Sequence, residues 1–497
     1  MKRFTSLLLA ILMIFSTAVF TLTSCDEEEE TKKNDGGNAV VNAGEAVEGD
    51  IFAERAAISD DIPEADFGGR TFRIVGHRTD EYYIKEENRN KGDLIADAKY
   101  ARNRSVEDRF NCVIDYAYQA SYTDVQSWVT KTVMSGADEF DLFCSHGASA
   151  GGSVLKNIFL NWYDIPHVDF SKPWWPSSCA DELTYDGKCI LAVSDFNYTA
   201  VSGAMCMFFN KNLASSYDMG NLYQVALDGK WTFDYFTELT KDIYIDSDGS
   251  GDKSDADFYG FAQSHAWQIG VSAWLWAFDN PTMAKDSDGV PQIAVKTDKI
   301  NNIVNELYDY LFNSNGVHYR RDNEAGQGMD LFLNKQTIFA MGNVGSPTGE
   351  GLRNFEDEYG MLPLPKWDEN QHGYYTMASG EHTVLAVPKT VKDTEFVGTV
   401  VEALSAESYK QVIPTLYEIA LKTRYLRDNE SKEVLDMLIE GRTYDFGYIY
   451  GGFQGFGFML GAMFEKGSNN FESYYASKYP NARIHYKKII KVFDKMS

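Results

Sequence analysis

The sequence predicts an α/β protein with a mainly parallel sheet, behind an export signal and an acidic segment. Short apolar strands alternate with amphipathic helices over residues 71–144, and this alternation favours parallel strands joined by crossover helices. The chain has 497 residues, 44% of them hydrophobic, which is enough for more than one core. The first 25 residues are basic and then apolar, as in exported proteins.

The N-terminal signal begins with Lys2 and Arg3 and continues in an apolar run over residues 7–20. This run has the length of a signal peptide and is short for a transmembrane helix. It ends in Leu22-Thr23-Ser24-Cys25, which resembles the bacterial lipobox. The resemblance implies a mature chain that starts at Cys25 and is anchored by lipid to the extracellular face of the cytoplasmic membrane, since two acyl chains hold stably. The alternative is a plain secretory signal with a chance cysteine.

An acidic segment follows the signal. Residues 26–66 carry fourteen Asp or Glu against Lys32, Lys33 and Arg55. Few large apolar side chains are present, so the segment cannot bury enough surface to offset the entropy of ordering. We therefore expect a disordered acidic tether over residues 26–65 that lifts the folded part off an anionic surface.

The formal net charge of −27 argues against nucleic acid or anionic lipid headgroups as partners, because both require basic patches. No second apolar run reaches 18 residues, so the signal is the only membrane element we expect. Five cysteines remain besides Cys25, without CxxC pairs or zinc-ligand spacing. Cys179 and Cys189 flank a hairpin turn at Asp186-Gly187, and either form a disulfide or stay buried thiols.

The first folded strand is predicted just after Phe67-Gly68-Gly69. Apolar runs predict strands at residues 71–76, 112–116, 140–144, 337–342, 359–364 and 383–387. Periodicity and capping predict helices at residues 97–110, 123–135 and 233–242, the last with Thr232 as N-cap. A long apolar run covers residues 204–211, and the mostly helical C-terminal third is interrupted by a glycine- and aromatic-rich stretch at 448–461.

Several short segments, in order, carry a resemblance to a known family. They are Gly229-Lys230-Trp231-Thr232, Phe332-Leu333-Asn334-Lys335, Phe339-Ala340-Met341-Gly342, Tyr359 to Lys366, and Val387-Pro388-Lys389-Thr390. Behind a lipobox, this order resembles the bacterial extracellular solute-binding lipoproteins of carbohydrate-type ABC transporters, the maltose-binding-protein-like family. The likeness covers most of residues 66–440. Insertions near 160–195 and 243–258 and an extended C-terminus depart from the family pattern.

The resemblance implies a two-lobe, periplasmic-binding-protein-like fold with an interlobe cleft and hinge crossings. Lobe one is expected over residues 66–203 and 366–408, and lobe two over 204–362 and 409–497. The crossings are expected at Gly203–Lys211, Met361–Trp367 and near Ser405–Tyr409. Ligands fit between lobes, and closure around the ligand would signal to the transporter.

The implied function is capture of a carbohydrate, expected to be an oligosaccharide, for the permease subunits of an ABC importer. The chain would then not be an enzyme. A secreted glycoside hydrolase is the alternative, because 73 acidic residues could supply the two carboxylates that such an enzyme needs. No nucleophile-elbow, HExxH or P-loop motif is present in the sequence.

A sugar site needs flat aromatic rings and polar groups that bind hydroxyls. Polar residues at predicted strand ends are candidates, since ligands lie beyond the carboxyl ends of parallel strands. The candidate ligand-binding residues are His77, Tyr83, Ser145, His146, Trp174, Trp175, Asp195, Trp267, Asn343 and Glu381. The alternative for Trp174 and Trp175, between Pro173 and Pro176, is a hydrophobic clamp between loops. Asn343 and Glu381 could instead be turn residues.

Residues 246–257 match the calcium-binding EF-loop pattern. Oxygen donors fall at loop positions 1, 3, 5, 9 and 12, and Gly251 stands at position 6, where the loop turns sharply. The expected ligands are Asp246, Asp248, Ser250, Asp257 and the backbone carbonyl of Asp252. Asp257 is shorter than the usual Glu at position 12, so we expect a weak, structural Ca2+ site. The alternative is a plain polar loop.

Overall fold

The computed structural model describes residues 51–77, 92–264, 269–320, 328–422, 429–451 and 455–496. The chain divides into two units, Met1–Glu48 and Gly49–Ser497, and every described residue belongs to the second. Within the described ranges, no helix combines the length and the apolar character needed to cross a membrane. The predictions for Cys25, for the tether up to residue 50, and for Tyr83 and Trp267 lie outside the described residues.

Four strands form the first sheet, in the order β13-β3-β1-β2. They are β1 (Arg70–Gly76), β2 (Cys112–Tyr118), β3 (Leu142–His146) and β13 (Thr383–Ala386). β1 runs parallel to β2 and β3, whereas β13 runs antiparallel to β3. The four strands predicted for this region are confirmed, and their apolar side chains, such as Phe72 and Val75, are buried.

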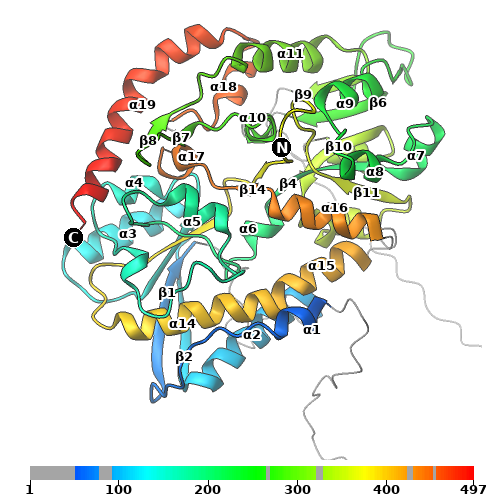
Figure 1. Cartoon of the computed structure of the whole chain (residues 1–497). Coiled ribbons are helices and arrows are strands. Elements are labelled where there is room, and N and C mark those ends of the chain that lie inside the picture. The colour runs from blue at the N-terminus through cyan, green and yellow to red at the C-terminus, as the bar shows by residue number, and fades with distance from the viewer. Residues whose placement is uncertain are drawn as a thin grey trace, which may run out of the picture. The chain divides into compact units, whose positions relative to one another are not determined.

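Helices pack beside this sheet (Figure 1). They include α2 (Leu94–Phe110), α3 (Tyr122–Met134) and α14 (Thr394–Glu407). α2 begins earlier than predicted, because the carboxylate of Asp93 accepts hydrogen bonds from the N–H groups of Ile95 and Ala96 and so caps the helix at that point. α14 packs on α2 and continues into a π-turn, η5 (Ser408–Val412), and α15 (Ile413–Lys422).

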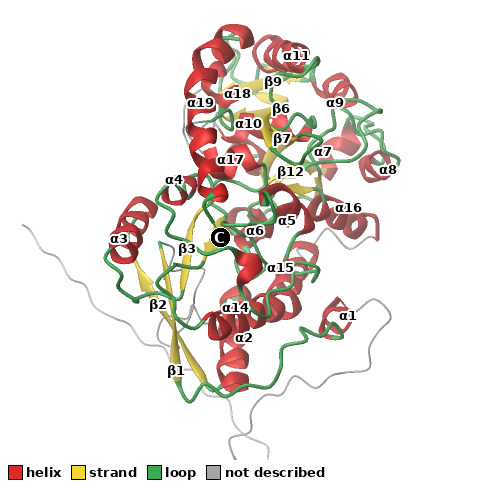
Figure 2. Ribbon diagram, turned by 60° about the vertical axis from the view of Figure 1, so that its left-hand side comes forward, coloured by secondary structure: helices red, strands yellow, loops and turns green. Residues whose placement is uncertain are grey.

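The second sheet has six strands, in the order β11-β4-β10-β6-β5 with β9 beside β6. They are β4 (Met205–Asn210), β5 (Tyr244–Ile245), β6 (Phe258–Ser264), β9 (Val317–Arg320), β10 (Thr337–Asn343) and β11 (Tyr359–Leu362). β6 is parallel to β9 and β10, and β4 is antiparallel to β10 and β11. Figure 2 shows β6 and β9 apart from β1, β2 and β3, so the strands form two separate sheets.

Helices and a hairpin complete the part around the second sheet. They are α7 (Lys211–Ser216), α8 (Leu222–Leu227), α9 (Phe233–Thr240), α10 (Ile269–Ala277), α11 (Ile300–Asn313), α12 (Met329–Leu333), α13 (Glu350–Arg353), α16 (Asn429–Glu440), β7 (Met283–Lys285) and β8 (Pro291–Ile293). Thr232 caps α9 as predicted, since its hydroxyl accepts a hydrogen bond from the N–H of Tyr235. The core here is aromatic, with Trp231, Phe236 and Trp274 fully buried.

Three stretches of chain lie side by side between the sheets. β12 (Thr376–Met377) pairs in parallel with β14 (Arg442–Thr443). On the other side, Ala204 forms an antiparallel bridge with Ala378, and the Ser379 N–H donates to the Gly203 carbonyl over 2.8 Å. Residues 203–205, 376–379 and 442–443 therefore form the hinge layer between the two sheets.

The segment at 361–367, expected as a crossing, packs against elements of the second sheet. The Phe233 N–H donates to the Lys366 carbonyl over 2.8 Å. Trp367 stacks on Phe233 with 6.0 Å between ring centroids. The chain then reaches the first sheet through residues 376–382 and β13.

Residues 51–65, expected within the tether, are ordered against the folded unit. Helix α1 (Ile51–Ala56) places the Arg55 guanidinium 4.3 Å from the ring centroid of Tyr409. Asp60 is buried and pairs with Arg109 over 2.5 Å. The acidic composition of this stretch did not predict these contacts, because its few long side chains find specific aromatic and basic partners in the fold.

The C-terminal helices touch parts beside both sheets. They are α17 (Phe446–Gly451), α18 (Met459–Phe464) and α19 (Phe471–Asp494). α17 contacts α4 (Gly151–Val154) and α5 (Ser177–Leu183) on one side and β7 on the other, while α18 packs on α10. α6 (Thr199–Ser202) and two 3-10 turns, η2 (Trp162–Asp164) and η4 (Ser346–Thr348), complete the described elements.

Cys179 and Cys189 are free, buried thiols. The Cys179 sulfur accepts a hydrogen bond from the Val193 N–H over 3.2 Å. The Cys189 thiol donates to the Leu191 carbonyl over 3.4 Å. Each sulfur thus has a backbone partner, and of the two alternatives for this pair the structure has the buried thiols.

Candidate ligand-binding site

His77 and His146 meet at the carboxyl edge of the first sheet. His77 directly follows β1, and His146 ends the neighbouring parallel strand β3, so both lie at one edge. Their ring centroids are 6.4 Å apart. Tyr122, in the first turn of α3, lies 4.8 Å from the ring of His146 and 6.1 Å from that of His77. The sheet therefore presents a cluster of three aromatic rings, two of which carry ring nitrogens.

The residues before β13 join this cluster. Thr383 lies opposite His146 in the ladder, and the Gly147 N–H donates to the His382 carbonyl over 2.8 Å. Glu381 is exposed. A Cβ atom on Gly380 would lie 3.4 Å from the His146 ring and 2.5 Å from the Tyr448 hydroxyl. Only a glycine lets the chain pass this close to both rings.

His382 is buried one residue further on. Burial lowers the pKa of His382 to about 4, so the imidazole is neutral at physiological pH. Its Nδ1 lies 2.8 Å from the Ser379 carbonyl, and because a carbonyl only accepts, Nδ1 carries the proton. Nε2 is then a buried acceptor, and no described residue donates to it. His382 fixes the turn that presents Glu381.

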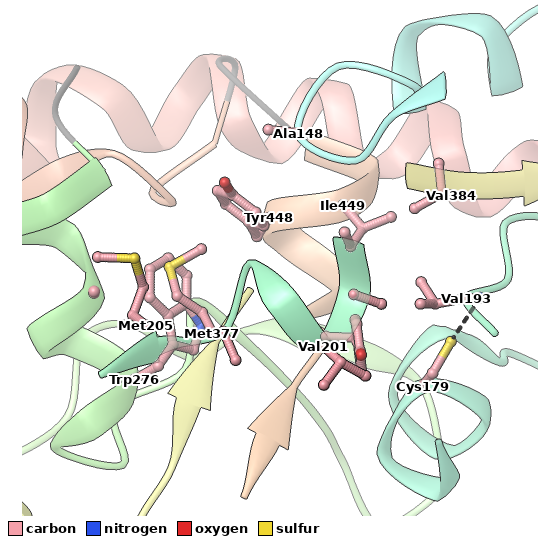
Figure 3. Packing of buried hydrophobic residues seen from close by; sticks show 14 of the residues in the cluster. Ala148, Cys179, Val193, Val201, Met205, Trp276, Met377, Val384, Tyr448 and Ile449 are labelled. Carbon is pink, nitrogen blue, oxygen red and sulfur yellow. Dashed lines mark hydrogen bonds between the residues drawn. The ribbon is translucent and has the colours of Figure 1, made fainter. Parts of the chain in front are cut away.

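Tyr448, from α17, joins the candidate site, although the sequence did not single it out. Its ring packs on Trp276 of α10 at 5.3 Å and on Phe458 at 5.5 Å, and Figure 3 shows it between Ala148 and Trp276. The hydroxyl is buried and has no hydrogen-bond partner among the described residues. Burial, and then the charge of Glu381, raise the pKa of Tyr448, so it stays a neutral donor. The glycine- and aromatic-rich stretch at 448–461 was the one signal for it.

The second sheet offers polar groups at its own carboxyl edge. β6 and β10 are parallel neighbours, so Ser264 and Asn343 end at the same side. The Ser264 hydroxyl, the Gln263 amide nitrogen and the Asn343 amide oxygen are buried, and none has a partner in the described part of the chain. Asn343 lies opposite Met205, which belongs to the hinge layer. Within the described residues, this edge therefore offers two donors and one acceptor without partners, beside the crossings.

Ser145 and the Trp174-Trp175 pair have structural contacts. The Ser145 hydroxyl is buried and accepts a hydrogen bond from the Gln126 amide over 3.2 Å. Both indoles are buried, and each donates its N–H over 2.8 Å to a different carboxylate oxygen of Glu402 on α14. Burial raises the pKa of Glu402 to about 7. These tryptophans clamp the loop to α14 and lie in the interior of the fold.

Asp195 is also internal. Its backbone N–H donates to the Trp174 carbonyl over 2.9 Å, and its side chain is buried, with Oδ1 lacking a partner among described residues. Burial raises the pKa of Asp195 to about 6, against the opposing charge of Arg442. The structure thus brings His77, His146 and Glu381 together at one edge, Asn343 at the other, and places Asp195, Trp174 and Trp175 inside.

The EF-like loop gathers three carboxylates. One oxygen from each of Asp246, Asp248 and Asp257 lies within 4.8 Å of the others. Gly251 has a φ of 79°, the left-handed conformation that suits a glycine at the sharp turn. The Ser250 hydroxyl donates to the Asp252 carbonyl over 3.0 Å, so these two predicted ligands lie side by side.

Asp257 is the buried member of the three. Burial favours its neutral form, but hydrogen bonds from the N–H groups of Ser254 and Ser247 outweigh this and lower the pKa of Asp257. It is therefore a carboxylate at neutral pH, with an oxygen directed toward the other two acids. Three charged oxygens at this spacing fit the oxygen ligands of Ca2+.

No protein-family model matches the sequence, and no curated protein matches it either. Solved structures do resemble it. The GacH receptor of Streptomyces glaucescens, solved unliganded and with acarbose, is 12% identical, with a TM-score of 0.55 over 85% of this chain and 99% of that one. A solute-binding protein of an ABC transporter from Thermotoga lettingae, bound to α-D-tagatose, is 12% identical, with a TM-score of 0.51 over 85% and 100%.

A third likeness is to the maltose/maltodextrin-binding domain MalE from Bdellovibrio bacteriovorus, bound to maltotriose. It is 12% identical, with a TM-score of 0.50 over 86% of this chain and 99% of that chain. At identities this low, the structural similarity shows the fold alone. It extends over nearly all of each solved chain. The chain has the two-lobe α/β fold of the maltose-binding-protein-like solute-binding proteins.

Proposed function

We propose that this chain is an extracellular, lipid-anchored solute-binding protein that captures a carbohydrate between its lobes for an ABC importer. One observation carries the proposal: His77, Tyr122, His146, Glu381 and Tyr448 gather at the carboxyl edge of the first sheet, beside the hinge layer. Proteins of the same fold hold acarbose, maltotriose and tagatose.

The chemistry of this edge suits a sugar. The rings of Tyr122 and the two histidines offer flat surfaces for the C–H faces of a pyranose. Glu381 accepts hydrogen bonds from hydroxyls, and the neutral Tyr448 phenol donates one. Asn343 and Ser264 would bind hydroxyls from the other lobe, so a ligand that spans both edges would favour the closed state. An oligosaccharide has the length and the hydroxyl count to reach both.

The anchor and the partners follow from the N-terminus and the fold. Cys25 at the end of the lipobox-like motif would carry the lipid, and the membrane is then reached through that anchor. The permease subunits of the importer are the protein partners, and nucleic acid is not one. Binding requires no covalent chemistry, so the chain is proposed to be a binding protein and not an enzyme.

The EF-like loop is proposed to hold one structural Ca2+. Asp246, Asp248 and Asp257 would supply carboxylate oxygens, and Ser250 and the Asp252 carbonyl the remaining protein ligands. The ion would relieve the repulsion among three charges and fix the loop next to β6.

Calorimetric titration with maltotriose, acarbose, tagatose and a panel of longer oligosaccharides tests the sugar proposal. We expect one of them to bind with 1:1 stoichiometry, to raise the melting temperature, and to reduce the radius of gyration. If no sugar binds and peptides do, the ligand class is wrong. If the chain instead hydrolyses a glycoside, and Glu381→Gln abolishes the activity, the glycoside hydrolase alternative replaces it.

A further inference from the structure

The last helix concentrates positive charge in an acidic protein. Residues 478–495 of α19 and its C-cap contain six Lys or Arg and one Asp, a net charge of +5, while the whole chain carries −27. The average over the chain therefore conceals a local basic patch. Figure 1 shows α19 (red) running past β7 and β8 toward the C-terminus.

The cations lie on the solvent side of the helix. We call Arg483, Ile484, Lys487, Lys488 and Lys491 the basic face. The four cations are exposed, and Ile484 among them is 54% exposed. Lys487, Lys488 and Lys491 stand three, four and seven residues after Ile484, the spacing that places helical side chains on one face. The opposite face, with Tyr486, Ile489 and Phe493, is buried.

Acidic partners are absent from this face within the described residues. Glu472, in the first turn of α19, pairs with Lys296. Within the described residues, no carboxylate lies at ion-pair distance from Arg483, Lys487, Lys488 or Lys491. Exposed cations on a helix are attracted to anionic headgroups, and the exposed isoleucine among them would enter the membrane interface.

A hollow of about 430 Å³ opens between α19 and the β7–β8 hairpin. Its lining includes Tyr479, Arg483, Tyr486, Lys487 and Gln292. Two members of the basic face thus stand at the rim of a concave surface that also offers a phenol and an amide. A guanidinium, an ammonium and a phenol are donors that suit a phosphodiester, while the Gln292 amide donates to the Asp286 carboxylate over 3.0 Å.

We propose that the basic face of α19 docks on the anionic phospholipid headgroups of the membrane, with Arg483 and Lys487 holding one phosphate at the rim of the hollow. The remaining surface, net negative, is repelled by the same lipids, so contact through α19 sets which side of the protein faces the membrane. The inference goes beyond the proposed function and does not depend on sugar binding. It revises the expectation, drawn from whole-chain charge, that anionic lipids are not partners.

The test uses the full chain with vesicles of phosphatidylcholine alone or with about 30% phosphatidylglycerol, which supplies the anionic headgroups. An environment-sensitive fluorophore is attached at Ile484→Cys, and a control fluorophore at Met134→Cys on α3, where the side chain is 68% exposed. Because the reporter senses its own surroundings, it works even when the N-terminus anchors every sample. The unsubstituted chain, labelled in parallel, gives the background from other thiols.

We expect the reporter at position 484 to shift to the blue only with phosphatidylglycerol and at low salt, and the reporter at 134 not to respond. Loss of one cation from an anionic surface weakens binding about fivefold. Arg483→Glu with Lys487→Glu should therefore raise the lipid concentration that gives a half-maximal shift at least about 25-fold, at constant vesicle composition. Lys131→Glu with Lys156→Glu makes the same charge change at exposed sites elsewhere and should leave the response intact.

Equal emission at position 484 on both vesicle types would overturn the proposal. So would a response that survives the double reversal on α19, or one that Lys131→Glu with Lys156→Glu removes equally. A stronger response to poly-glutamate or to duplex DNA than to the anionic vesicles would assign the face to an acidic protein or to nucleic acid. Should the double reversal fail to fold, Lys488→Gln with Lys491→Gln probes the same face with less change.

Discussion

Removing the Tyr448 hydroxyl should weaken ligand binding without weakening the fold. In the structure this hydroxyl is buried and has no partner in the described part of the chain. A buried polar group without a partner costs free energy and contributes none. We therefore expect Tyr448→Phe to leave the free energy of unfolding unchanged within about 0.5 kcal/mol, or to raise it by up to about 1 kcal/mol.

The loss in binding follows from the same hydroxyl. If it donates to a ligand oxygen, Tyr448→Phe removes that hydrogen bond and leaves a buried acceptor on the ligand. The expected cost is about 1–3 kcal/mol, which corresponds to a Kd about 5- to 150-fold higher. The ring itself keeps its contacts with Trp276 and Phe458, because phenylalanine retains the aromatic ring.

Tyr450 provides the matched control, two residues further along α17. Its hydroxyl accepts from the Leu191 N–H over 3.2 Å and donates to the Leu183 carbonyl over 3.3 Å. Tyr450→Phe leaves both backbone groups without this partner, so the free energy of unfolding should fall by about 1–3 kcal/mol while Kd stays the same. Urea unfolding and calorimetric titration of both variants measure the four quantities. A Tyr448→Phe variant that loses stability but binds normally would refute the reasoning.

Three further predictions follow from other parts of the chain. The pKa of Glu402 is about 7 in the fold and 4.5 in the unfolded chain, so the side chain binds a proton on folding between these pH values. The free energy of unfolding is therefore highest below pH 4.5. It falls by about 3 kcal/mol as the pH rises through 7, at about 1.36 kcal/mol per pKa unit. Urea unfolding should show this loss in the wild type and not in Glu402→Gln, and parallel pH profiles would contradict it. With calcium at ten times its Kd, chelation should lower the free energy of unfolding by about 1–1.5 kcal/mol and so lower the melting temperature. Asp246→Ala should abolish that sensitivity. A wild type whose melting temperature does not respond to chelator leaves the plain-loop alternative. Cys25→Ser should release the protein from the membrane fraction or leave it unprocessed, and a cleaved variant that still sediments with membranes would disprove lipid anchoring.

Much of the site edge was predictable because it depends on local patterns and one geometric rule. The apolar runs before His77 and His146 predicted β1 and β3, and parallel neighbours end at the same edge of a sheet. The ladder between β13 and β3 then brings Glu381 to that edge. None of these steps needs a contact between distant side chains, so a single sequence carries enough information for them.

Other residues depend on partners that the local sequence does not reveal. Trp174 and Trp175 stand in a proline-flanked loop that is equally consistent with a cleft lining or a clamp. Glu402, more than 200 residues later, decides between these by accepting both indole N–H groups. Tyr448 likewise reaches the site only because Gly380 leaves room for its hydroxyl. Sequence composition marked both regions as unusual but could not assign the contact.

The distribution of charge over the surface is another property that the composition of the whole chain does not reveal. A net charge is an average, and it excludes a polyanionic partner only if the charges are mixed evenly over the surface. In this chain they are not, since α19 places four exposed cations around Ile484 while acidic residues dominate elsewhere. The excess of Lys and Arg at residues 478–495 can be counted in the sequence. Only the structure shows that these cations face solvent, while Tyr486 and Phe493 hold the other side of the helix in the core. The orientation of the protein at a membrane would thus be set by the one segment whose charge opposes the rest.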